Sequence, residues 1–189
     1  MKTPVFQRLF QALLLRRSVY EYAAREPDSW REAVAVVCIV ALAEGLSLSD
    51  VVSKELGVPA ALTLFVVMAY DLVCWLLVGL LAYPIGRLVT PRAASTAVFD
   101  DADADHAPDL RRLLRCFGFG TAPVVLRAFG FLDPSRSWLP MLVGTWLFAS
   151  SFVAYRAALP TTNARAALAA FLLRATIIVI HLTTGVQLL

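Results

Sequence analysis

Long apolar runs separated by short polar segments are the main pattern of the sequence. The runs cover about 31–48, 58–83, 112–132, 138–156 and 166–188. Each has roughly the 20 residues that a helix needs to cross the hydrocarbon core of a bilayer. The pattern predicts an all-α, polytopic membrane protein, with five transmembrane helices in a membrane domain over 31–189.

The segment before the first run has a different periodicity, which predicts an amphipathic helix over residues 4–24. Pro4 suits a first helical turn. Its apolar stripe consists of Phe6, Leu9, Phe10, Leu13 and Leu14. Arg16 and Arg17 follow, and would reach lipid headgroups. This composition is typical of a helix lying on the membrane surface, although the same stripe could equally pack against the rest of the protein.

The segment 1–30 is therefore expected to be cytoplasmic: the surface helix followed by a capping turn. In "EPDSWREA", Ser29 and Glu32 have the spacing of a capping box at the start of the first span. Trp30 is placed as an interfacial anchor.

Composition agrees with a membrane protein. The 189 residues are 59% hydrophobic and 16% charged, whereas soluble domains are about 45–50% apolar and about 25% charged. Thirteen Lys and Arg flank the spans on the N-terminal side of the membrane and two on the other. This bias predicts a cytoplasmic N-terminus and an external C-terminus. The net charge of +3 does not suggest nucleic-acid binding.

Five ionisable residues inside the runs are the strongest candidate functional residues. They are Glu44, Asp71, Arg127, Arg174 and His181. At 1.5 Å of rise per residue, all but Arg174 fall at similar depths on four helices. An unpaired charge at the bilayer centre costs at least about 2.5–3.5 kcal/mol. We therefore expect an acid, Glu44 or Asp71, within hydrogen-bonding range of one of the three bases.

Three roles are open to this intramembrane charge network. It could hold helices together, contact a charged helix of a partner, or carry protons or ions. Arg does not titrate, which disfavours a path, whereas His181 could switch near neutral pH.

The third run contains a second candidate element, Gly118, Gly120 and Pro123. The glycines would let a neighbouring helix approach closely. The proline should kink the span.

Other chemistry finds little support in the residues. In "FDDADADHAPDL", Asp101, Asp103 and Asp105 imitate a calcium loop, but His106 replaces the required Gly. A solvated acidic loop is expected, with docking to a basic partner, or to the basic run at 111–115, as the alternative. The three cysteines form no CxxC pair. We expect no enzyme activity, metal or cofactor, although one intramembrane histidine leaves room for a pigment or a singly ligated haem.

The chain also resembles a known group, the Yip (Ypt/Rab-interacting protein) domain family of small five-span membrane proteins. The resemblance rests on "EPDSWREA", on "CFGFGTAPVVLRAF", and on "WLPMLVGTWLFASSFVAYRAAL" with the turn and last span that follow. The Asp-Leu-x-Gly-Pro element of the eukaryotic trafficking members is absent. The resemblance therefore implies a bacterial-type member, an integral membrane protein without a defined role in traffic.

These observations predict a non-catalytic accessory or scaffold protein of a bacterial inner membrane. It would pack against membrane lipids and against other membrane proteins or further copies of itself. No small-molecule substrate is implied. The alternative is a small proton or ion channel or transporter subunit that uses Asp71, Glu44 and His181.

Overall fold

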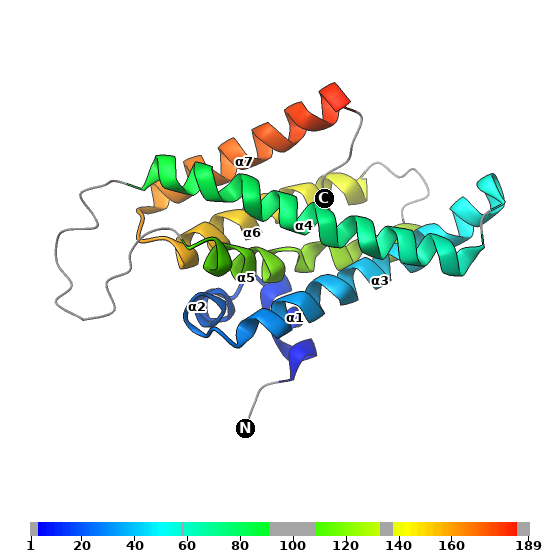
Figure 1. Cartoon of the computed structure of the whole chain (residues 1–189), viewed down its shortest axis with the longest axis horizontal. Helices are drawn as coiled ribbons and strands as arrows, with labels where there is room; N and C mark the ends of the chain where they lie inside the picture. Colours follow the sequence, from blue (N-terminus) through cyan, green and yellow to red (C-terminus); the bar gives the residue numbers. More distant parts are fainter. Residues whose placement is uncertain (1–3, 58, 91–108, 133–137, 185–189) are drawn as a thin grey trace.

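The computed structural model describes residues 4–57, 59–90, 109–132 and 138–184, and all regular structure in these ranges is helical. In chain order the elements are α1 (Val5–Leu13), α2 (Arg17–Arg25), α3 (Ser29–Leu56), α4 (Ala60–Val89), α5 (Leu110–Gly120), the 3₁₀ helix η2 (Ala122–Leu132), α6 (Trp138–Ala158) and α7 (Asn163–Thr184). From α3 onward, successive elements run in alternating directions along the long axis of the bundle, with α5 and η2 sharing one pass (Figure 1).

Helix α5 lies at the centre of this bundle. Every residue from Leu113 to Gly120 is buried, because α2, α3, α4 and α6 all pack against it. Small residues permit the close packing: a Cβ added to Gly118 would lie 2.8 Å from the Cβ of Ala33 on α3. The third apolar run is therefore enclosed by protein over its first half.

The α-helix of the third run ends at Gly120, just before Pro123. Pro123 has no N–H to donate to the carbonyl four residues earlier, and its ring crowds that carbonyl, so the chain continues from Ala122 as a 3₁₀ helix instead. The backbone departs from helical angles again at Phe129. The expected interruption is thus a change of helix type rather than a single kink.

The N-terminal segment forms two helices instead of the one predicted over 4–24. Leu15 has a φ of 54°, in the left-handed region. The Leu15 N–H donates to Ala12 O and the Arg16 N–H to Gln11 O, each at 2.9 Å. This is a Schellman motif, the usual way to end a helix, with leucine in the position that glycine normally takes. The absence of that glycine explains why the sequence pattern did not reveal the break.

Helices α1 and α2 pack against the bundle, and α2 runs across its long axis (Figure 1). Val19, Tyr20, Ala23 and Ala24 of α2 are buried. The predicted stripe on α1 is split: Leu9 and Leu13 pack against the core, whereas Phe6 is 70% exposed and Phe10 59%. Arg16 and Arg17 are also exposed.

The predicted capping box takes a different form. The Ser29 hydroxyl donates to Ala23 O and Glu26 O at the end of α2. Glu32 pairs with Arg8 of α1 and accepts a hydrogen bond from Tyr22 of α2. Both residues therefore join the N-terminal helices to α3.

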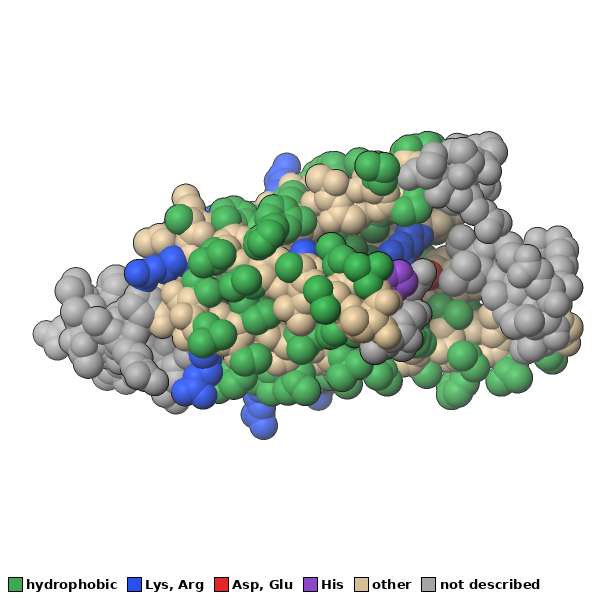
Figure 2. Space-filling view, turned by 90° about the horizontal axis from the view of Figure 1, so that it is seen from above, with side chains coloured by type: hydrophobic (Ala, Val, Ile, Leu, Met, Phe, Trp, Pro, Cys, Tyr) green, Lys and Arg blue, Asp and Glu red, His purple; other side chains and the backbone are tan. Residues whose placement is uncertain are grey.

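Large apolar side chains cover much of the outer surface, as Figure 2 shows for one face. Among the described residues, α4, α6 and α7 are long and apolar enough to cross a membrane. They carry exposed side chains such as Phe65 (70%), Met141 (74%) and Leu182 (76%). Apolar surface of this extent indicates contact with lipid, and so a membrane location.

Glycine substitutions test the close packing of α5. We expect Gly118→Ala to lower the thermal midpoint of the detergent-purified protein by several degrees, because the new methyl group overlaps Ala33, and overpacking costs about 1–3 kcal/mol. Gly144→Ala is the matched control, since no atom of the described residues lies within 4 Å of a Cβ there. Equal midpoints for the two variants would contradict the packing at Gly118.

Candidate functional site

The structure brings Glu44 of α3 and Arg127 of η2 together. Arg127 Nη1 lies 2.6 Å from Glu44 Oε1, which is the pairing of an intramembrane acid with a base that the sequence predicts. The Glu44 side chain is 12% exposed and that of Arg127 34%. A charge-assisted bond of this length ties the irregular second half of the third run to α3.

Asp71 of α4 lies beside this ion pair. It is 4% exposed and interacts electrostatically with both Glu44 and Arg127. Its Oδ2 atom is buried and makes no hydrogen bond within the described part of the chain. Two carboxylates therefore face one guanidinium group in a region of low dielectric constant.

Arg174 extends the cluster to α7. Its Nη2 donates to Ser151 Oγ of α6 at 3.2 Å, and its charge interacts with that of Arg127. Ser151 in turn donates to Leu147 O at 2.7 Å. Four of the five predicted residues are thus brought together, and Arg174 donates to a hydroxyl group of α6.

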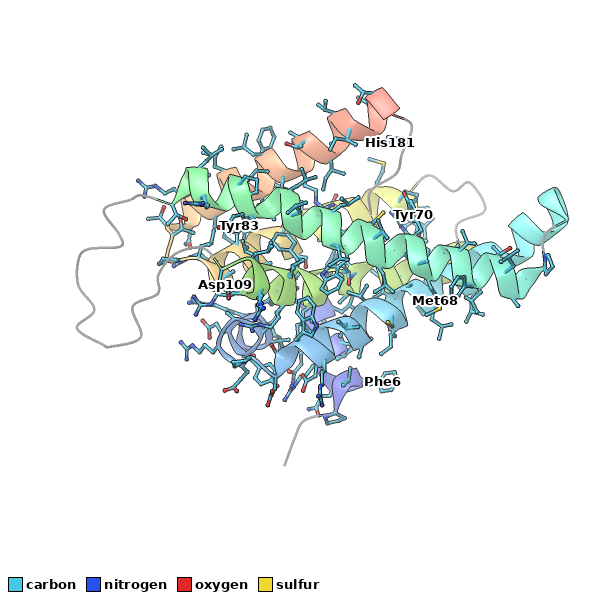
Figure 3. The ribbon with its side chains drawn as sticks, viewed as in Figure 1. Phe6, Met68, Tyr70, Tyr83, Asp109 and His181 are labelled. Carbon is cyan, nitrogen blue, oxygen red and sulfur yellow. The ribbon has the colours of Figure 1, made fainter. Side chains whose placement is uncertain are left out.

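His181 lies towards the C-terminal end of α7 (Figure 3) and is half-buried. Seen from above, a histidine side chain and basic and acidic atoms are visible where α7 ends, beside apolar side chains (Figure 2). Arg127 and Arg174 are likewise only partly covered. The cluster is therefore open to the outside of the bundle through an otherwise apolar surface.

A second polar cluster, which the sequence did not predict, joins α2 to α5. Arg115 is 8% exposed; its Nε donates to Ala23 O at 2.9 Å and its Nη2 to Ala24 O at 3.2 Å. Arg112 Nε donates to Ala24 O at 3.0 Å. These carbonyls belong to the last turn of α2, where the helix dipole also favours a cation. The only sequence signal was the "RRLLR" spacing.

Tyr20 links the same region to α6. Its hydroxyl lies 2.9 Å from Ser150 Oγ, and Ser150 donates to Gly120 O at 2.8 Å. That bond satisfies a carbonyl at the C-terminal end of α5. Burial raises the pKa of Tyr20 well above its ordinary value, so the hydroxyl stays protonated and keeps its role in this chain of contacts.

Several predicted features lie elsewhere. Asp101, Asp103, Asp105 and His106 fall outside the described residues. Cys38, Cys74 and Cys116 form no disulfide. No group of three or more His, Cys, Asp or Glu in the described ranges could hold a metal ion.

Comparisons with known proteins add no assignment. The chain matches no family model, no curated protein and no solved structure. The resemblance to the Yip family therefore stays a prediction.

The ion pair generates a prediction about stability. Arg127→Leu should strand Glu44, and Glu44→Leu should strand Arg127, each destabilising the fold by about 3 kcal/mol. This is the low end of the range for buried pairs, because Arg127 is a third exposed. The double variant removes both charges and should recover at least half of the loss.

Thermal midpoints and folded yields in detergent measure the effect. Arg165→Leu controls for replacing an exposed arginine, and should behave like the unmodified protein. Additive losses in the double variant would show that the two side chains do not interact.

Proposed function

We propose that the chain is a non-catalytic, five-span accessory or scaffold subunit that packs against another membrane protein. The observation that carries the proposal is the opening of the charge cluster, with Arg127 34% exposed, through an apolar surface. A guanidinium group facing hydrocarbon is strongly unfavourable. A polar side chain of a neighbouring protein would cover it.

The proposed membrane arrangement has α3 and the α5–η2 pass as two further spans beside α4, α6 and α7. Their alternating directions support this arrangement (Figure 1). Most basic side chains visible in Figure 2 lie over the half of the molecule where α4 ends and α7 begins. The excess of positive charge favours a cytoplasmic location for that end, in a bacterial inner membrane.

Helices α1 and α2 would then lie at the cytoplasmic surface. Phe6 and Phe10 point away from the bundle, and Arg16 and Arg17 are exposed nearby in sequence. Aromatic rings beside arginines suit the boundary between acyl chains and headgroups. In this arrangement α1 contacts both the protein and the membrane.

A topology measurement tests the arrangement. Reporter fusions at residues 1 and 189 should place the N-terminus in the cytoplasm and the C-terminus outside, because an odd number of spans separates them. Finding both ends on the same side would exclude five spans.

Two neighbouring residues on α7 test the accessory role. In mild detergent we expect the chain to co-purify at fixed stoichiometry with another membrane protein or with a second copy of itself. His181→Ala should reduce this association several-fold, because the side chain lies at the opening. Leu182→Ala is the control, since Leu182 is 76% exposed on the apolar surface.

A monomer that retains no partner, or equal losses in the two variants, would contradict the proposal.

Asp71 supports the alternative, a proton path, because its Oδ2 atom makes no hydrogen bond to the described residues. Asp71→Asn with normal folded yield but lost proton flux in reconstituted vesicles would favour transport over the accessory role.

A further inference from the structure

A basic cavity lies at the end of the bundle far from the charge cluster. Its volume is about 250 Å³, and it lies between α2, the start of α5, and the connection from α6 to α7. The charged residues that line it are Arg17, Arg25, Arg112 and Arg156, with Glu21 as the single acid. Four arginines and one glutamate give the lining a formal charge of +3.

Two of these guanidinium groups, those of Arg112 and Arg156, are held in place by hydrogen bonds to other parts of the fold. Arg112 Nε donates to Ala24 O, and Arg156 donates to Thr161 O and, through Nε at 2.6 Å, to Asn163 Oδ1. Arg17 pairs with Glu21 at 2.7 Å. Arginines whose positions are fixed in advance lose less entropy when they bind an anion.

These contacts leave donors of the arginines for a ligand. Within the described residues, Arg112 uses only its Nε, and Arg25, an exposed residue, makes no hydrogen bond through its side chain. Guanidinium forks suit the tetrahedral oxygens of a phosphate group, which they bind with two parallel hydrogen bonds. Their origin on separate elements suits a compact anion approached from several sides.

The rest of the wall has a different character. Ala157, Ala158, Leu159 and Pro160 complete the lining where α6 ends. An apolar wall beside a cluster of arginines, at the end of membrane-crossing helices, is the arrangement in which anionic lipid headgroups bind. Neither the predicted surface helix nor the packing of α2 onto α5 requires four arginines to converge here.

We propose that this cavity binds a phosphate group, carried by the headgroup of an anionic phospholipid or by a small soluble phosphate. The proposal does not depend on the role of the charge cluster. Bound phosphate would bridge α2 to the α6–α7 connection, and so link the N-terminal helices to the membrane domain.

The experiment uses the full chain in two arms. In the first, detergent-purified protein is titrated with inorganic phosphate at constant ionic strength, with chloride as the reference anion. In the second, the protein is placed in nanodiscs of phosphatidylcholine with or without phosphatidylglycerol. Thermal midpoint and, for the second arm, lipid retained in native mass spectrometry are measured.

Arg25→Gln and Arg156→Gln test the lining, and Arg165→Gln is the matched control. Arg165 is exposed near the start of α7 and does not line the cavity. We expect saturable stabilisation by phosphate or by phosphatidylglycerol, weakened about tenfold or more in the two lining variants and unchanged in the control. Arg25→Gln removes no hydrogen bond of the described fold, so its loss of binding cannot be attributed to unfolding.

The two arms distinguish the source of the phosphate group. Saturation by inorganic phosphate with no preference among nanodiscs identifies a soluble ligand, and the reverse identifies a lipid. Equal effects of chloride and phosphate together with no preference for phosphatidylglycerol, or equal weakening by Arg165→Gln and Arg25→Gln, would overturn the proposal.

Discussion

The close contact between α3 and α5 is the constraint on which the bundle depends. At Gly118 the two helices approach until no side chain fits between them, and at Gly79 the space for a Cβ is already occupied by Leu114, 2.2 Å away. Gly118 of α5 makes room for α3, and Gly79 of α4 makes room for α5, so that α3 and α4 cover α5 on two sides. The uncovered flanks are then filled by α2 and α6, and the N-terminal helices become part of the membrane domain's core.

Enclosing α5 in this way places polar groups near both of its ends inside the bundle, and different interactions satisfy the two sets. At its N-terminal end, Arg112 and Arg115 donate to the carbonyls that close α2. The cations satisfy acceptors that the helix itself leaves unpaired. Beyond its C-terminal end, the 3₁₀ segment carries Arg127, whose partner is the carboxylate of Glu44. The arginines at the N-terminal end of α5 satisfy backbone carbonyls, whereas the Arg127–Glu44 pair balances charge within an apolar layer.

The sequence predicts where the helices lie along the chain better than which side chains meet between them. Periodicity located the helical runs, but stopped the second at 83, before Pro84, whereas α4 continues to Val89. Proline is tolerated inside helices of this kind because the surrounding helices compensate for the lost hydrogen bond. The helix break at Leu15 was not predicted, because no glycine marks it in the sequence.

The pairing of the charged residues is likewise predicted only in part. Depth along each helix suggested that Glu44 and Arg127 could meet, and they do. Among residues at equal depth, the rotation of each helix about its axis decides which side chains meet. A single sequence indicates that rotation only weakly. Arg174, for example, donates to Ser151, an uncharged residue that a comparison of charges at equal depth does not include. The convergence of Arg25, Arg112 and Arg156 on one cavity depends on tertiary packing and had no local signal.

The position of α2 also determines the order in which the protein can be assembled. Tyr20 contacts Ser150, 130 residues later in the chain. The Ala23 carbonyl accepts a hydrogen bond from Arg115, 92 residues later. At a synthesis rate of about 5–20 residues per second, the interval is on the order of ten seconds. During that time α1 and α2 lack their partners on α5, η2 and α6. A membrane surface close to the emerging segment would shelter them, so the final contacts of the fold are made by the residues that are synthesised first.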